Sequence, residues 1–215
     1  MQQSLFQEKY SWPIRIWHWL TFIIVTALLF TVLVSQTFLD GEHTGIVITG
    51  AAAKKGSVLT EQQVRTMVGS LRQTIWKWHT YFGYVLGGLF LFRLVLEFFQ
   101  PKEQRFITKF KKGLTASKNT ADKKDGRHYR FVKFIYALFY ILLATIVITG
   151  LLMAFYDNDP AMSKDTFHNI KEIHEKCYYI LLGFLFIHLA GVIKAEFGKD
   201  KNITSRMING GNDIA

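Results

Sequence analysis

Apolar residues are concentrated in four long blocks along the chain, and polar connectors separate the blocks. About 20 consecutive, mostly apolar residues suffice for a helix to cross the hydrocarbon core of a bilayer. Phe22–Val34 and Phe134–Phe155 contain no charged residue, whereas a soluble bundle would place charges opposite a narrower apolar stripe. The pattern predicts an all-α membrane protein, a bundle of four transmembrane helices over about 14–35, 76–99, 131–155 and 165–197.

The connector between the first two blocks changes character along its length. Its first part is expected to be loop-like, because glycine recurs in it at positions 41, 45, 50 and 56. From Thr60 onward, Thr60-x-x-Gln63 resembles a capping box, and apolar residues follow at helical spacing at positions 64, 67, 68 and 71. This second part predicts a short amphipathic helix that lies along the outer membrane surface.

Positive charge is unevenly distributed between the connectors, within a formal net charge of +10. Residues 100–130 contain ten lysines or arginines against three acidic residues, and the C-terminal tail adds further basic residues. The positive-inside rule therefore puts this connector and both termini in the cytoplasm. On this interpretation the basic excess reflects topology and attraction to anionic membrane lipid, and no nucleic-acid partner is predicted.

Two features narrow the class of protein further. The first apolar block is too long for the core of a signal peptide, and no small-residue cleavage site closely follows it, so a retained helix is expected. Cys177 is the single cysteine. An internal disulfide and a thiolate metal cluster are therefore excluded.

Four of the seven histidines fall in the predicted membrane helices, where ionisable side chains are costly and usually functional. His174 and His188 are 14 residues apart, which brings them within about 40° on one helix face, about 21 Å apart along the axis. Helix direction puts His18 at the cytoplasmic depth of His188, and His79 at the outer depth of His174. The expected pairs are His18–His188 and His79–His174.

Two imidazoles that face each other between bundle helices are the arrangement needed for bis-histidine ligation of a haem iron, and this pattern provides it twice. One alternative is that each histidine forms an interhelical hydrogen bond. Another is zinc, but a tetrahedral site needs three or four ligands together. His43, His128 and His168 lie outside the membrane parts of the helices and are not expected to be ligands.

Three further residues are candidates for contact with the haems. Gly83, one turn after His79, would leave room for a porphyrin, or would serve close helix packing. Arg93 shares a face with His79 near the depth of the inner haem, where a guanidinium suits a propionate. Arg93 would otherwise pair with Glu97 or extend to the cytoplasmic interface. Arg15, three residues before His18, is a similar candidate.

Several motifs together resemble those of the bacterial four-helix di-haem b-type cytochromes. This family includes bacterial cytochrome b561, the cytochrome subunit of membrane-bound nickel–iron hydrogenases and the gamma subunit of formate dehydrogenase. The motifs are Arg15-Ile16-Trp17-His18-Trp19, His79-Thr80-Tyr81-Phe82-Gly83, Arg93, Thr149-Gly150 and the His174…His188 spacing. The resemblance covers essentially residues 1–215 as a single domain. It implies two haem b groups ligated by His18, His79, His174 and His188, exchange of electrons with membrane quinone, and a multi-pass location in the bacterial inner membrane.

The function expected from these features is electron transfer as the cytochrome b subunit of a larger, quinone-linked oxidoreductase. The long outer connector suggests a docking surface for a periplasmic or membrane redox partner, and no catalytic residue is predicted. One alternative is a self-sufficient quinone-reducing enzyme such as a superoxide oxidase. A more distant alternative is a haem-free anchor or transporter, although inverted-repeat similarity is not evident.

Overall fold

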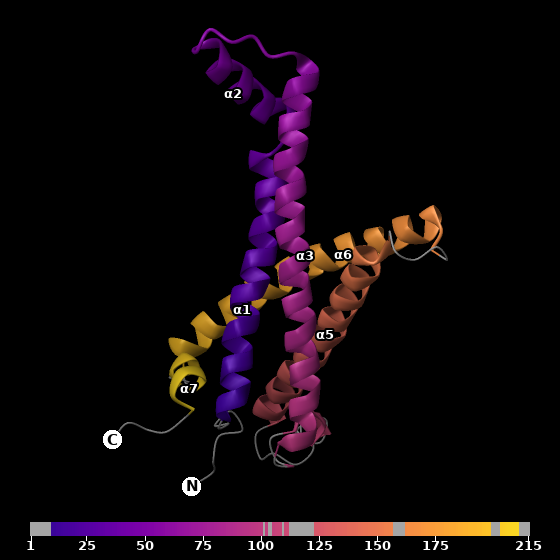
Figure 1. Cartoon of the computed structure of the whole chain (residues 1–215). Helices are drawn as coiled ribbons and strands as arrows, with labels where there is room; N and C mark the ends of the chain where they lie inside the picture. The colour runs from indigo at the N-terminus through magenta and orange to yellow at the C-terminus, as the bar shows by residue number, and fades with distance from the viewer. Residues whose placement is uncertain are drawn as a thin grey trace. The chain divides into compact units, whose positions relative to one another are not determined.

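The computed structural model describes residues 10–100, 102, 105–108, 110–111, 123–156, 162–198 and 203–210. Within these ranges the chain is helical and contains no strand. Four segments are long and apolar enough to cross a membrane, namely Trp12–Phe38, Glu61–Phe99, Arg130–Ala154 and Lys164–Glu196. The all-α fold with four membrane helices is therefore confirmed. The elements are α1 (Trp12–Leu33), the π-helical turn η1 (Val34–Phe38), α2 (Gly41–Ala53), α3 (Glu61–Phe99), α5 (Lys123–Ala154), α6 (Lys164–Glu196) and α7 (Ile203–Asn209), as drawn in Figure 1.

The chain forms two compact units. The first contains Met1–Trp19 and Gly88–Ala215, and the second contains Leu20–Gly87. Helices α1 and α3 each contribute residues to both units.

In the first unit, α5 and α6 form an antiparallel helical hairpin. Tyr156, just after α5, meets Phe167 in the first turn of α6, with ring centroids 4.3 Å apart. Nearer the middle of both helices, Phe139 stacks on Phe184 at 4.7 Å, and Leu143 between these levels is fully buried. Ser163 caps α6 by accepting a hydrogen bond from the Thr166 amide at 3.1 Å. The predicted start of this helix, ahead of its apolar block, is confirmed.

In the second unit, α2 replaces the loop-like segment predicted from its glycines, so that prediction was wrong. A glycine in a helix costs about 1 kcal/mol relative to alanine, and α2 is helical although it contains three of them. A Cβ on Gly45 would lie 3.4 Å from Val64 Cγ1, so the missing side chain lets α2 approach α3 closely. Gly56 ends the turn after α2 with a φ of 74°, where glycine is favoured.

The capping box predicted at Thr60 is present. The Thr60 amide donates to Gln63 Oε1 at 2.9 Å, and the Gln63 amide donates to Thr60 Oγ1 at 3.3 Å. The helix that begins here is not a separate surface helix, however, because α3 continues without a break for 39 residues. No proline interrupts the sequence between residues 71 and 76. At about 1.5 Å per residue, α3 is about 58 Å long, roughly twice the thickness of a bilayer core.

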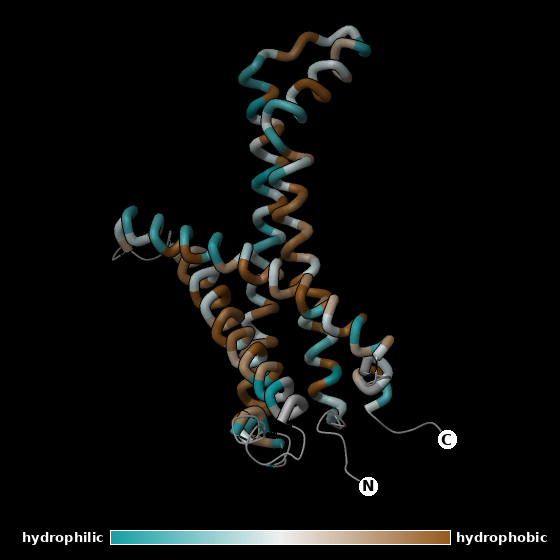
Figure 2. The backbone as a smooth tube through the Cα atoms, turned by 180° about the vertical axis from the view of Figure 1, so that it is seen from behind, coloured by the Kyte–Doolittle hydropathy of each residue, from teal (hydrophilic) through white to brown (hydrophobic). Residues whose placement is uncertain are grey.

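The membrane helices expose much of their apolar surface. Figure 2 shows hydrophobic residues along most of their length, and Ile141, Phe186 and Ile187 are each more than 60% exposed. Large contiguous apolar surfaces are rare on soluble monomers. Lipid contact is the natural environment for these faces.

Candidate functional site

His18 and His188, which are predicted to share one depth in the membrane, lie together in the first unit. Their ring centroids are 6.4 Å apart, and the ring planes are inclined by 58°. Trp19 contacts the His18 ring edge-on at 5.6 Å, and Phe184 stacks on the His188 ring at 5.9 Å. Both imidazoles are half-buried and are supported by aromatic neighbours.

This separation can be compared with that of two imidazoles on one metal ion. A metal–imidazole bond is about 2.0–2.1 Å long, so two rings bound from opposite sides have centroids about 6.3 Å apart. The Nδ1 atom of His18 is buried and has no hydrogen-bond partner among the described residues. Burial without a partner is costly for a polar atom. The pair therefore fits an ion held between two axial imidazoles.

His174, on α6, is held by Thr149 from α5. Thr149 Oγ1 lies 2.9 Å from His174 Nδ1, and the same hydroxyl donates to the Thr145 carbonyl at 2.7 Å. Since the hydroxyl has one proton and donates it to the carbonyl, its oxygen accepts from Nδ1–H. This arrangement selects the tautomer with the lone pair on Nε2, the form that ligates a metal.

Gly150 provides the space for the His174 ring. A Cβ built on Gly150 would lie 3.2 Å from His174 Cε1 and 3.8 Å from Nδ1. The first distance is shorter than an ordinary carbon–carbon contact of about 3.5–4.0 Å. Thr149 thus orients the imidazole of His174, and the neighbouring Gly150 leaves room for the ring.

His79, in the second unit, has the same kind of support. Thr31 Oγ1 lies 2.8 Å from His79 Nδ1 and donates to the Leu28 carbonyl at 2.6 Å. Trp76 contacts the His79 ring edge-on at 5.3 Å. No role for Thr31 or Thr149 follows from the sequence patterns above. Each lies in an apolar run that contains other hydroxyl residues, so a hydroxyl alone does not single it out.

The remaining histidines and Gly83 are placed as follows. His43, on α2, and His168, on α6, are exposed. His128 is in the helical backbone of α5, but its side chain lies outside the described residues. A Cβ on Gly83 would meet nothing within 4 Å among the described residues of its own unit. The space beside Gly83 is therefore open there, and that unit gives no close packing at this glycine.

Arg93 is buried in a polar and aromatic cluster of the first unit. Its guanidinium donates to Tyr140 Oη at 2.9 Å and to Glu97 Oε2 at 3.2 Å, and it lies 5.8 Å from the Trp17 ring centroid. The indole N–H of Trp17 donates in turn to the Leu89 carbonyl at 2.9 Å. Of the roles considered for Arg93, pairing with Glu97 is the one present in the structure.

Arg15 contacts the C-terminal helix. Its guanidinium donates to the Ile208 carbonyl of α7, and the indole N–H of Trp19 donates to the Met207 carbonyl at 3.2 Å. Gly210 follows α7 with a φ of 87° and lies close to Arg15. Two residues that flank His18 in sequence thus hold the end of α7, which we call the α7 clamp.

The donor set limits the metal chemistry that these sites can support. No group of three or more His, Cys, Asp or Glu side chains converges in the described part of the chain. A pair of imidazoles suits a metal whose other ligands come from a macrocycle, as in haem, better than it suits tetrahedral zinc. The His18–His188 geometry and the tautomers of His79 and His174 fit this type of ligation.

Comparison with known proteins gives one match. A family model described as prokaryotic cytochrome b561 matches residues 9–210. No curated protein and no solved structure matches the chain. The matched range includes the four candidate ligands, His18, His79, His174 and His188, and every helix described above.

Proposed function

The chain belongs to the prokaryotic cytochrome b561 family, and from this premise we propose that it carries electrons across the membrane through two b-type haems. Membership of the family makes it a multi-pass membrane protein of b-type haem electron transport. The number of haems, their ligands and the electron-transfer partners are parts of the proposal.

The observation that carries the proposal is the pair of imidazoles 6.4 Å apart on α1 and α6. His18 and His188 are the proposed axial ligands of an inner haem. Arg93 and Arg15 are proposed to face its propionates, since both are cations of the same unit. Their contacts to Glu97 and to the Ile208 carbonyl would hold them in place beside it.

The outer haem is proposed to be ligated by His79 and His174. Their pairing is inferred from helix direction and depth in the sequence. The two threonine hydroxyls support the role of both histidines as ligands. Each hydroxyl accepts from Nδ1–H and so leaves the Nε2 lone pair of its histidine available for a metal. Gly83 is proposed to provide room for the macrocycle on α3.

The protein's own contribution is to hold the haems, to orient their ligands and to shield them from water. Bound haem supplies one-electron chemistry at its iron. The histidines would ligate the iron, the threonines would hold the Nδ1 protons, and the apolar helices would exclude water. Together these features would set the redox potentials. Residues 1–215 are proposed to form a single di-haem unit.

Membrane quinone and a periplasmic or membrane redox protein are the proposed exchange partners, in the bacterial inner membrane. The length of α3 supports a partner outside the membrane. The helix is about twice as long as a bilayer core is thick, so about half of it would extend beyond the core. This extension and α2, which contacts it through Gly45, offer a helical surface for a partner. The role proposed is therefore that of an electron-transfer subunit.

A reduced-minus-oxidised visible spectrum of the purified protein, combined with a haem-to-protein ratio, tests the proposal. We expect low-spin b-type bands and two haems per chain. A ratio of one would contradict the di-haem assignment, and a zinc-loaded protein without haem would contradict the proposal as a whole. Rapid quinone reduction by the isolated chain would instead identify a complete enzyme.

Gly150→Ala is expected to disturb one haem and leave the other unchanged. The added methyl group would lie 3.2 Å from His174 Cε1, so the ring must shift by a few tenths of an ångström. We expect a changed low-spin EPR signal and faster loss of that haem on heating. Gly183→Ala is the matched control, because a Cβ there meets nothing within 4 Å of the described chain. If both variants match the wild type, the role of Gly150 is wrong.

A further inference from the structure

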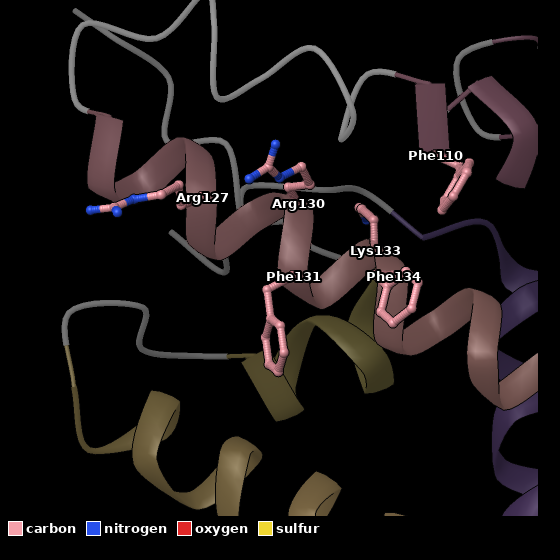
Figure 3. Close-up of a pocket in the computed structure, with 6 residues that line it drawn as sticks. All are labelled: Phe110, Arg127, Arg130, Phe131, Lys133 and Phe134. Atoms are coloured by element: carbon pink, nitrogen blue, oxygen red, sulfur yellow. The ribbon is translucent and has the colours of Figure 1, made fainter.

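A cavity of about 400 Å³ lies at the beginning of α5, away from all four candidate ligands. Figure 3 shows its six lining residues, five from α5 and Phe110 from the segment before it. The five are Arg127, Arg130, Phe131, Lys133 and Phe134. Among the residues that the structure describes, three cations and three aromatic rings line the cavity.

The cations are arranged to receive an anion. Arg127, Arg130 and Lys133 follow one another at intervals of three residues, so they lie along one side of α5. Arg127 and Arg130 are exposed, and no carboxylate among the described side chains forms an ion pair with them. Lys133 is 5% exposed, and its ammonium lies 5.3 Å from the Tyr136 ring centroid. An arginine fork suits a phosphate group bidentately.

The rings provide an apolar surface directly beside the cations. Phe131 and Phe134 are 60% and 58% exposed, and each lies one helical turn beyond an arginine, at Arg127 and Arg130 respectively. The segment of α5 that can cross the membrane begins at Arg130. Arg127 and Arg130 therefore lie at the edge of this segment, where headgroups are expected, and Phe134 lies about 6 Å further along the axis, where acyl chains begin.

From this arrangement we propose that the cavity is a binding site for an anionic phospholipid. The phosphate would contact Arg127 and Arg130 beside Lys133, and an acyl chain would lie along Phe131 and Phe134. A free phosphate or nucleotide would use the cations but would leave the exposed rings uncovered. Basic pockets at the cytoplasmic side of membrane helices are known to hold anionic headgroups. Occupancy of the site at the start of α5 would then depend on the lipid composition of the surrounding leaflet.

Native mass spectrometry of the delipidated full-length protein, with phosphatidylglycerol or phosphatidylcholine added, tests this inference. We expect phosphatidylglycerol to bind more tightly to the wild type. The Arg127→Gln/Arg130→Gln variant should bind phosphatidylglycerol about 30-fold more weakly, since each basic residue near the surface contributes about 1 kcal/mol. The Phe131→Ala/Phe134→Ala variant should also weaken binding.

Matched controls separate a defined site from general charge. Arg72→Gln/Lys77→Gln removes two exposed cations from α3 and should leave lipid binding unchanged. Arg127→Lys/Arg130→Lys keeps the charge and should retain most of the binding. The visible spectrum of each variant reports whether the fold survives, independently of lipid.

Equal binding of the two lipids would overturn the proposal, and so would equal losses in the α3 and α5 charge variants. If inorganic phosphate displaces the lipid completely and the phenylalanine variant binds like the wild type, the site is one for free anions. The lipid assignment would then be wrong.

Discussion

In the His188→Ala variant, the purified protein is expected to carry one haem per chain instead of two. The rings of His188 and His18 lie together within the first unit, with centroids 6.4 Å apart. Alanine removes an axial ligand, and half of a bis-histidine site does not hold a haem iron in low-spin form. The haem-to-protein ratio and the reduced-minus-oxidised spectrum measure the loss.

Companion variants show whether the loss is local. His18→Ala should remove the same haem, so the double variant should look like either single one. His174→Ala should remove the other haem. His43→Ala and His168→Ala, at exposed positions, should keep both haems, as should His128→Ala. His188→Met retains a possible axial ligand and should raise the potential of one haem. Two intact haems in His188→Ala would refute the assignment of the inner site.

The second large effect is expected at Thr149. Thr149→Val keeps the shape of the side chain but removes the oxygen that accepts from His174 Nδ1–H. Loss of such a partner typically weakens metal binding by about 10–100-fold. A hydrogen bond from Nδ1–H makes the imidazole a stronger donor and favours ferric iron, so its loss should raise the potential of that haem. A net hydrogen-bond energy of about 0.5–1.5 kcal/mol corresponds to about 20–65 mV for one electron.

A potentiometric titration followed by visible absorption measures this shift. Thr149→Ser keeps the hydroxyl and should restore a near-native potential, which a purely structural role for the methyl group would not do. The potential of the other haem should remain unchanged in both variants. If Thr149→Val leaves both potentials unchanged, or if Thr149→Ser is equally perturbed, the hydroxyl does not orient His174.

Sequence patterns located the four membrane helices because apolar composition over about 20 residues responds to the bilayer alone. The same patterns missed the early start of α5, which begins at Lys123 among charged residues that carry no apolar signal. They also misjudged α2, which is helical although it contains three glycines, residues of low helix propensity.

The candidate site was partly predictable for a related reason. Helix direction and spacing give the depth of each histidine, and this was enough to suggest His18 and His188 as partners. Sequence spacing could not predict contacts that depend on helix rotation and side-chain torsions. Spacing offered Glu97 as a partner of Arg93 on the same helix, but it gave no indication of Tyr140 on α5. The hydroxyls of Thr31 and Thr149 were missed for the same reason.

The α7 clamp has a consequence for biosynthesis. Arg15 and Trp19 flank His18, yet the carbonyls that they hold belong to residues 208 and 207, which lie 193 and 188 residues further along the chain. The nascent chain emerges from its N-terminus, so the helix that bears His18 is made long before His188 or α7 exists. Such distant contacts form late. The inner haem should therefore be inserted only after residue 188 has been made, and a ribosome stalled before residue 188 should display a chain without this site.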